Sequence, residues 1–415
     1  MKVFIQEYAT SGGLPKEKSN AKLLVEGFGI LRVILQNCKR LGYEVVTTIN
    51  KQIRFLTPYL DADKVVSFSP KENLIKKSLE LINGCDYFLV IAPETHDILS
   101  HIVKNYQKSI GRSLNCQLDG IDITTYKSKA YEFCASKGIL FPKTIKINKD
   151  GSSKLISLTK LEDFTQEESP NDYELGYPLI IKPDDGVACE GLSLCKNKEE
   201  FNKKLLKMGK SNFLIQEFIK GDNLSVTALV WDRHINILSI NEQILSLGFR
   251  RSEYLGGISN VKHVDREKII SFCEKLLHLF KGLNGLIGID LVISGDKDQP
   301  KNIYLIEINP RPTTALCGLL NQSNPPIPII PNSTFSKGEN FNTTYFMKVR
   351  FDIIRERSVN LHEEFINNQS IVTPPISFNS KEIYSLIRGF GKNKKIARAN
   401  FDENLNSLLS KLKKE

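Results

Sequence analysis

Several features that mark particular classes of protein are missing from this 415-residue sequence. It has no apolar run near the roughly 20 residues that cross a bilayer. Its start, Met-Lys-Val-Phe-Ile-Gln-Glu, has an acidic residue where a signal peptide would continue its apolar segment. The eight cysteines form no Cys-x-x-Cys pair, and the six histidines do not cluster near them. We therefore expect a cytoplasmic protein with no membrane partner, whose cysteines are buried free thiols rather than zinc ligands or disulfides.

The balance of charge is basic, +10 at pH 7, which suits either nucleic acid or polyanionic ligands such as nucleoside triphosphates. The lysines are spread along the chain and concentrate only near its end, at Lys392, Lys394 and Lys395. The sequence has no recognised nucleic-acid module and no basic stripe interleaved with aromatic residues. We therefore expect no nucleic-acid partner and interpret the excess lysine as a solvated surface.

The first hundred residues alternate short apolar runs with amphipathic stretches. This pattern predicts strands at residues 3–5, 44–48 and 86–92 and a helix at residues 21–38. Residues 86–92 form a continuous apolar run, as in a strand of a buried parallel sheet. The alternation of strand and helix predicts a small α/β layer.

After residue 111 a predicted helix at residues 127–137, ended by Gly138 and Pro142, leads into a region dominated by strands. The polar residues 148–172 are interpreted as a surface excursion. The elements predicted beyond them are strands at residues 178–182, 213–216, 224–230, 235–240, 286–293 and 302–309, and a helix at residues 266–281. Antiparallel strands with few helices indicate an α+β unit behind the α/β unit.

The last part of the chain is less informative. The proline-rich residues 322–340 predict a loop or linker, residues 344–354 a strand, and the tail from Asn400 a lysine-rich helix. Residues 380–389 mix apolar and polar side chains without a clean period.

Two carboxylates interrupt otherwise apolar strands, in Gly-Ile-Asp290-Leu-Val and in Tyr-Leu-Ile-Glu307-Ile-Asn309-Pro-Arg311. Side chains at positions i and i+2 of a strand point to one face, so Glu307 and Asn309 can converge. Oxygen ligands of this kind suit Mg²⁺, which is usually shared with substrate phosphates. Arg311 beside them can make bidentate contacts to carboxylate or phosphoryl oxygens.

A second motif is a lysine that ends an apolar strand, in Pro-Leu-Ile-Ile-Lys182-Pro-Asp-Asp-Gly186. A buried lysine is costly unless it meets an anion, and the glycine turn behind it lets backbone N–H groups approach phosphates. Third, the strand at residues 213–216 runs into Glu217, Phe218 and Ile219, where backbone groups could meet an adenine edge. The polar side chains that follow could hold a ribose.

The order of these motifs, from Lys127 to Thr314, resembles the ATP-grasp superfamily. The stretches Glu-Tyr-Ala-Thr-Ser-Gly-Gly-Leu from Glu7, Leu-Val-Glu-Gly from Leu24 and Ala-Pro-Glu-Thr from Ala92 are similar to the subgroup that contains tyramine–glutamate ligases. The resemblance covers about the first three quarters of the chain.

The resemblance implies a role for each matching residue. Lys127 and Lys182, with the Gly186 loop, would bind the phosphates of ATP, and Gln216, Glu217, Phe218 and Ile219 its adenine. The ribose would meet Asp222 or Asn223, because Asn223 stands where glutamate is common in the family. Mg²⁺, or alternatively Mn²⁺, would be bound by Asp290, Glu307 and Asn309. Arg311 and Lys182 would be catalytic.

The resemblance also implies three parts: an N-terminal α/β pre-ATP-grasp domain at residues 1–110, an antiparallel ATP-grasp domain at residues 111–330 with a lid at about 140–220, and a C-terminal extension of unknown role at residues 331–415. A homodimer is left open.

The predicted function is ATP-dependent joining of a small carboxylate, such as an amino acid, to an amine through an acyl phosphate. The sequence has no convincing Ser-His-Asp or Cys-His arrangement, and this reaction needs none. Candidate substrate-binding residues are Glu7, Thr10, Ser11, Gly12 and Gly13, at the end of the first strand and in the turn after it. Two more are Arg250 and Arg251, which lie between the hinge at residues 216–219 and the metal-binding strands. Two alternatives stay open: tyramine–glutamate ligation specifically, or an ATP-binding sensor or scaffold without turnover.

Overall fold

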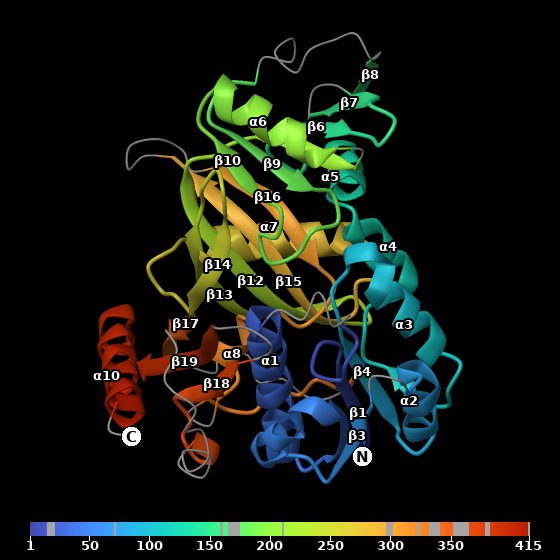
Figure 1. Cartoon of the computed structure of the whole chain (residues 1–415). Coiled ribbons are helices and arrows are strands. Elements are labelled where there is room, and N and C mark those ends of the chain that lie inside the picture. The colour runs from blue at the N-terminus through green and yellow to red at the C-terminus, as the bar shows by residue number, and fades with distance from the viewer. Residues whose placement is uncertain are drawn as a thin grey trace.

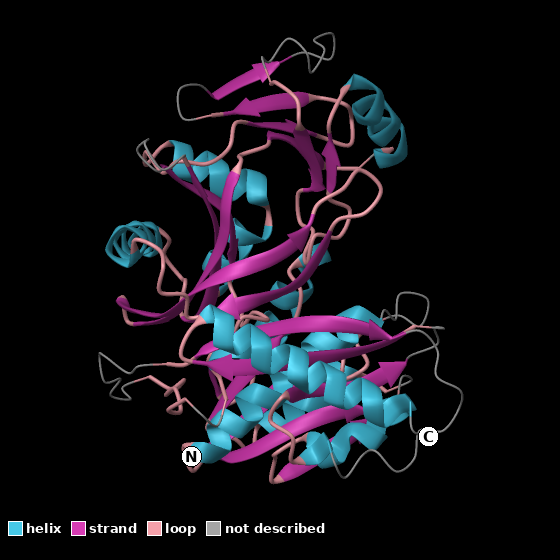
Figure 2. Cartoon of the chain, turned by 90° about the vertical axis from the view of Figure 1, so that its left-hand side faces the viewer, coloured by secondary structure: helices cyan, strands magenta, loops and turns pink. Residues whose placement is uncertain are grey.

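A computed structural model describes residues 1–14, 21–69, 72–157, 161–164, 175–209, 211–295, 302–321, 324–331, 341–351, 365–377 and 382–413. The described strands form three sheets, shown from two directions in Figures 1 and 2. No helix within these ranges is long and apolar enough to cross a membrane. Most of the proline-rich residues 322–340, predicted as a linker, lie outside the described ranges.

The N-terminal sheet is parallel and has the strand order β3-β2-β1-β4-β5. Its strands are β1 (Lys2–Glu7), β2 (Glu44–Asn50), β3 (Lys64–Phe68), β4 (Tyr87–Ile91) and β5 (Arg112–Ser113). The helical elements of this region are α1 (Ala21–Arg40), η2 (Lys51–Tyr59), α2 (Leu74–Ile82), η3 (Thr95–Asp97), α3 (Ile98–Tyr106) and α4 (Leu118–Thr125). All five residues of β4 are buried, which explains its unbroken apolar sequence. The predicted α/β layer is confirmed.

A six-stranded sheet with the order β10-β9-β11-β6-β7-β8 forms the upper lobe in Figure 1. It contains β6 (Thr144–Ile147), β7 (Ser153–Ile156), β8 (Leu161–Phe164), β9 (Leu179–Pro183), β10 (Ser193–Cys195) and β11 (Phe213–Glu217), with α6 (Lys198–Met208). The lobe has a small core of its own, centred on Ile145, Ile181 and Ile215. The interpretation of residues 148–172 as an excursion is wrong for β7 and β8, which are too short to show a period in the sequence.

The largest sheet has the order β16-β15-β12-β13-β14-β17-β19-β18. Its strands are β12 (Gly221–Trp231), β13 (His234–Ser246), β14 (Glu253–Ser259), β15 (Gly285–Ser294), β16 (Asn302–Asn309), β17 (Thr343–Phe351), β18 (Ile371–Ser377) and β19 (Ile383–Gly391). The accompanying helices are α7 (Arg266–Leu279), α8 (Leu316–Leu319) and α10 (Lys394–Lys413), while α5 (Lys127–Ala135) contacts α4 and β7 of the six-stranded sheet. The predicted antiparallel arrangement is confirmed, since each described pairing in this sheet is antiparallel.

The C-terminal strands extend this sheet instead of standing apart from it. A Cβ atom added to Gly29 of α1 would lie 2.8 Å from Leu386 of β19, and one added to Gly389 of β19 would lie 2.1 Å from the backbone nitrogen of Phe401 in α10. Thus α1 and α10 both pack closely against β19, and residues 384–389 are buried. Because burial is nearly continuous along β19, residues 380–389 show no alternation in the sequence. The tail helix begins at Lys394, earlier than predicted.

The packing of β19 predicts that Leu386→Ala destabilises the protein. Leu386 is fully buried, so its truncation should cost about 2–5 kcal/mol of unfolding free energy. Leu206→Ala is the matched control, because Leu206 is 85% exposed on α6 and should change stability by no more than about 0.5 kcal/mol. Urea unfolding followed by circular dichroism measures both. Equal midpoints for the two variants would show that the C-terminal strands are not part of the main core.

Candidate functional site

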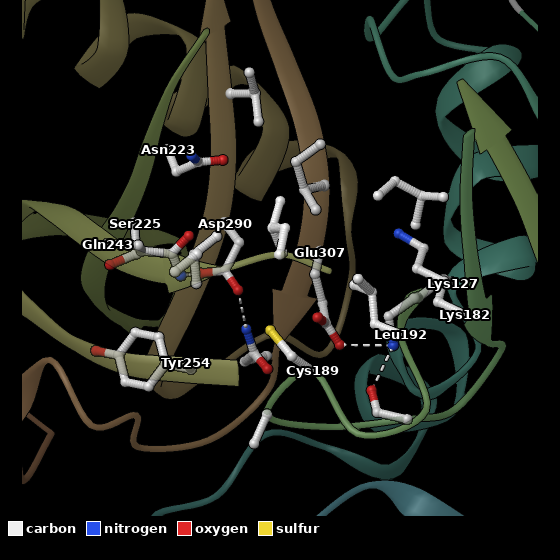
Figure 3. A pocket seen from close by; sticks show the side chains of 18 of the residues that line it. Lys127, Lys182, Cys189, Leu192, Asn223, Ser225, Gln243, Tyr254, Asp290 and Glu307 are labelled. Atoms are coloured by element: carbon white, nitrogen blue, oxygen red, sulfur yellow. Dashed lines mark hydrogen bonds and ion pairs between the residues drawn. The ribbon is translucent and has the colours of Figure 1, made fainter. Parts of the chain in front are cut away.

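A cavity of about 210 Å³ that opens to solvent lies between the six-stranded and the eight-stranded sheet. Figure 3 shows Asp290 and Glu307 on one wall and Lys127 and Lys182 on the other. The predicted residues that line this cavity are Lys127, Lys182, Gly186, Gln216, Glu217, Phe218, Ile219, Asn223, Asp290, Glu307, Asn309 and Arg311. The fold therefore brings together side chains spread over 185 positions of the sequence, from 127 to 311, counting both ends.

Asp290 and Glu307 are direct neighbours across the β15–β16 ladder, and Asn309 pairs with Gly288 two positions along it. Asp290 accepts hydrogen bonds from Gln243 Nε2 at 3.1 Å and from Asn309 Nδ2 at 3.4 Å. Burial, with a contribution from the Glu307 carboxylate, raises the pKa of Asp290 to about 7. Two buried carboxylates side by side repel each other, so this wall favours a bound cation.

Lys127 begins α5 and reaches Glu307, one of these two carboxylates. Its Nζ lies 2.9 Å from Glu307 Oε1 and donates a hydrogen bond of 2.7 Å to the Gly186 carbonyl. The side chain is buried, which by itself lowers its pKa, but the attraction of Glu307 offsets the burial and the pKa of Lys127 is raised above 10.5. Lys127 therefore stays charged near neutral pH.

Lys182 is the cation of this site that lacks a carboxylate partner among the described residues. It lies near the end of β9, is 5% exposed, and donates to the Tyr131 hydroxyl at 3.3 Å. Burial, together with repulsion from Lys127, lowers the pKa of Lys182 to about 8. A buried ammonium group facing a cavity without a counter-ion is a binding site for an anion.

The turn after β9 is fixed from outside the cavity. Asp184 accepts hydrogen bonds from the Ser128 backbone at 2.8 Å and from its hydroxyl at 2.6 Å, while the Asp185 carbonyl accepts from Thr95. Ala188 and Cys189 have positive φ angles of 52° and 62°, so the turn bends without glycine there. Burial raises the pKa of Cys189 to about 12, which keeps its thiol protonated and unreactive.

The hinge from β11 to β12 lines the cavity with Gln216, Glu217, Phe218 and Ile219. Glu217 Oε1 accepts from the Lys143 backbone at 2.9 Å, so this side chain braces the hinge. Beyond the hinge, Asn223 lines the cavity, whereas Asp222, one position earlier on β12, does not. This geometry favours Asn223 over Asp222 for a contact with a bound ligand.

Arg311 is held by Glu94, a residue that the motif analysis quoted without giving it a role. Arg311 Nε donates to Glu94 Oε2 at 3.0 Å, and Glu94 Oε1 is buried without a hydrogen-bond partner. Burial lowers the pKa of Arg311, but Glu94 more than compensates, so its pKa is raised. The loop after β4 of the N-terminal sheet thus positions the guanidinium group of the cavity.

Glu26, quoted above in the motif from Leu24 without a role, belongs to a further group at the cavity wall. Glu26 of α1 accepts a hydrogen bond from Thr314 Oγ1 at 2.9 Å and forms an ion pair with Lys348 of β17. The Lys348 ammonium also lies 5.5 Å from the centre of the Tyr254 ring, which lines the cavity. The available signal was an acidic residue inside the apolar run of a predicted helix. It could not reveal the partner, which is 322 residues away.

Residues predicted to bind substrate lie outside the lining of this cavity. The Glu7 carboxylate accepts hydrogen bonds from the backbone of Ala9 at 3.1 Å and of Thr10 at 2.7 Å, and burial raises the pKa of Glu7 to about 7. Thr10 and Ser11 are buried, and Gly12 and Gly13 are partly exposed. Arg250 is exposed, and Arg251 pairs with Glu253 at 2.8 Å. The substrate role of these residues stays a prediction.

The donor set fits a divalent cation shared with an anionic ligand. Within the described ranges, no group of three or more histidine, cysteine, aspartate or glutamate side chains is placed to hold a metal ion by itself. Asp290 and Glu307 supply two carboxylates and Asn309 an amide oxygen, and Mg²⁺ commonly takes few protein ligands and completes its shell with phosphates and water. The raised pKa of Asp290 indicates an acidic site that a cation would stabilise.

Comparison with known proteins gives two family matches. Residues 127–315 match the model of an ATP-grasp domain and residues 43–121 that of a pre ATP-grasp 3 domain. Tyramine–L-glutamate ligase from Methanocaldococcus jannaschii is 29% identical over 323 residues, which cover 77% of this chain and 84% of that protein.

Two solved structures share the fold. An ATP-grasp superfamily protein from Archaeoglobus fulgidus has a TM-score of 0.58 at 21% identity and covers 93% of this chain and 99% of its own. N5-carboxyaminoimidazole synthase from Aspergillus clavatus, solved with ADP and an aminoimidazole ribonucleotide, has a TM-score of 0.64 at 13% identity and covers 100% and 99%. The predicted ATP-grasp architecture is confirmed.

The pKa of Lys182 predicts a pH dependence of nucleotide binding. In the free protein, Lys182 is protonated below pH 8 and neutral above it, so the dissociation constant of ATP without divalent metal should rise above pH 8, by at most about tenfold per pH unit. Lys127 keeps its charge over this range. Titration calorimetry in EDTA from pH 7 to 9.5 measures the slope. Lys182→Arg, which stays charged, should flatten it. A slope unchanged in Lys182→Arg would assign the titration to another group.

Proposed function

We propose, from the premise that this chain is an ATP-dependent ligase with an ATP-grasp domain, that it joins a carboxylate to an amine through an acyl phosphate. One observation carries this proposal: the cavity has Lys182, which has no carboxylate partner among the described residues, on one wall. The adjacent carboxylates of Asp290 and Glu307 lie on the opposite wall. One wall attracts phosphate and the other attracts the cation that accompanies it.

ATP would lie between the two sheets, with its adenine at the backbone of residues 216–219 and its ribose near Asn223. Lys127 and Lys182 would contact the phosphates, with the Gly186 turn beside them. Mg²⁺ or Mn²⁺ would be held by Asp290, Glu307 and Asn309, and when bound it would neutralise charge on the transferring phosphoryl group. The structure with ADP among the fold relatives supports the nucleotide.

In this reaction the protein would position the substrates and stabilise negative charge, and no side chain would act as a nucleophile. A substrate carboxylate attacks the terminal phosphate of ATP, ADP leaves, and the amine then displaces phosphate from the acyl phosphate. Lys182 and Arg311 would stabilise the negative charge that develops on the transferring group and on the tetrahedral intermediate. Glu94 fixes Arg311 for this task, since the two side chains are joined by a hydrogen bond of 3.0 Å.

For the substrates, we propose L-glutamate and tyramine as the first pair, because a tyramine–L-glutamate ligase is similar over 77% of this chain. An amine needs an acidic or hydrogen-bonding partner, and Glu26 lines the cavity beside Tyr254 and Thr314. We place the acceptor amine at Glu26.

The domain boundaries at residues 110 and 330 stay predictions.

The proposal predicts that the protein releases ADP only when both substrates are present. With Mg²⁺, ATP, L-glutamate and tyramine, a coupled assay should detect ADP, and other amino acids and amines define the specificity. Glu307→Gln should lower kcat by about a hundredfold or more, because a charged ligand is replaced by a neutral one of the same shape. Glu199→Gln is the control, since the Glu199 side chain is 75% exposed on α6. Tight ATP binding without turnover on any pair would favour the sensor alternative.

The amine position predicts a separate effect for Glu26→Gln. The amide keeps an acceptor for Thr314 but loses the charge, so the KM for the amine should rise by about tenfold or more. The KM for ATP should stay within about threefold of the wild-type value, since the change removes no predicted nucleotide contact. Steady-state kinetics with each substrate varied in turn separates the two. A lower kcat with an unchanged KM for the amine would contradict this placement.

A further inference from the structure

A second cavity lies away from the first, against residues 32–36 of α1. Its volume is about 500 Å³, and it opens to solvent. The wall is formed by α1, by residues 58–61 at the end of η2, by residues 366–369, by β18, and by Arg388 of β19. Nothing in the proposed ligase reaction uses this space.

Two arginines of this wall, Arg32 and Arg388, are each 3% exposed. Arg32 Nη1 donates to the carbonyls of Ile371 at 2.7 Å and Val372 at 3.0 Å. Arg388 Nη1 donates to the carbonyls of Cys317 at 2.6 Å and Leu320 at 3.0 Å. These acceptors are neutral, and neither arginine has an ion pair with a carboxylate within the described ranges. The two guanidinium groups hold the backbone in place, but no carboxylate of the described residues forms an ion pair with them.

A buried guanidinium group without a carboxylate beside it is unfavourable for the folded protein. Burial lowers the pKa of Arg32 to about 10, and burial with repulsion from Arg32 lowers that of Arg388 to about 9. Arg32 Nε is buried without a hydrogen-bond partner, so one charge-bearing donor of this wall is unused. Buried arginines normally have a carboxylate or another anion beside them, because burying an unpaired charge destabilises the folded protein.

The rest of the wall suits an anion as well. Gln36, Asn367 and Asn368 add side-chain amides, which can donate hydrogen bonds. The carboxylate of Asp61 also lines the cavity, but this residue is exposed at the surface. Arg32 lies 5.4 Å from the centre of the Tyr59 ring, which orients it without removing its charge.

We propose that this cavity binds a compact dianion, a phosphate group or a dicarboxylate, between Arg32 and Arg388. Two guanidinium groups match two negative charges, and guanidinium is the group that best recognises planar or tetrahedral oxyanions. The site is separate from the ATP cavity and does not depend on the proposed reaction.

The site is connected to the ATP cavity by two elements. Arg32 and Glu26 are on the same helix, α1, and Glu26 lines the ATP cavity. Arg388 holds the carbonyls of Cys317 and Leu320 around α8, which directly follows the lining residues Thr314 and Ala315. An anion that neutralises the two arginines therefore stabilises the elements that form one end of the ATP cavity.

The test is a thermal unfolding titration of the full chain with inorganic phosphate and, separately, with succinate, at constant ionic strength set by KCl. We expect the unfolding midpoint to rise and saturate with at least one dianion and not with chloride. The stronger of the two dianions identifies the class of ligand. No saturable rise with either would overturn the proposal.

Two variants locate the effect. Gln36→Glu places a carboxylate on α1 beside the arginines without removing them, so it should weaken dianion binding by about tenfold or more and should not lower the midpoint in chloride alone. Lys182→Met removes an anion-binding group of the ATP cavity and should leave the dianion effect unchanged. If the effect survives in Gln36→Glu and is lost in Lys182→Met, the dianion binds in the ATP cavity and the proposal is wrong.

Discussion

The ion pair between Lys127 and Glu307 connects the parts of the molecule that form the cavity between the six-stranded and the eight-stranded sheet. Glu307 belongs to β16 of the eight-stranded sheet, and the Lys127 ammonium also bonds to Gly186, in the turn that follows β9 of the upper lobe. The backbone N–H of Lys127 donates to the Asp184 carbonyl at 3.0 Å, so the same residue holds that turn twice. Because Lys127 is buried, these contacts are not screened by water. These contacts of one lysine at the start of α5 therefore help to fix the relative position of the two sheets.

Two other ion pairs at the cavity also join residues that are far apart in the sequence. The loop after β4 supplies Glu94 to Arg311, and β17 supplies Lys348 to Glu26 of α1. Each pair joins a residue of the N-terminal region to one far along the sequence. The C-terminal strands are thus part of the site's construction, since without β17 the carboxylate of Glu26 would be buried beside the cavity with no cation.

The sequence predicted those parts of the structure whose signal is local. Apolar runs gave β4, β12, β15 and β16, and the i, i+2 spacing of Glu307 and Asn309 indicated a shared face. It did not predict β19, whose apolar residues are interrupted by the buried polar residues Ser385 and Arg388, or β7, which is too short to show a period. Partners across the fold were also out of reach, because no pattern in the chain links Glu94 to Arg311 or Glu26 to Lys348. The turn at residues 10–13 was predicted as a substrate site because it follows the first strand, and this role stays a prediction; the structure adds that Glu7 accepts hydrogen bonds from the backbone of Ala9 and Thr10.

One of the two carboxylates of the cavity, Glu307, is paired with a lysine. Lys127 supplies part of the positive charge that Asp290 and Glu307 require, and Lys182 remains for an anion. A nucleotide that arrives with its cation brings opposite charges to the two walls at once. Glu307 would bind such a cation in place of Lys127, and Lys127 would then be available to the phosphates. Because charge is exchanged between partners instead of being newly buried, we infer that nucleotide and cation bind together more favourably than either does alone.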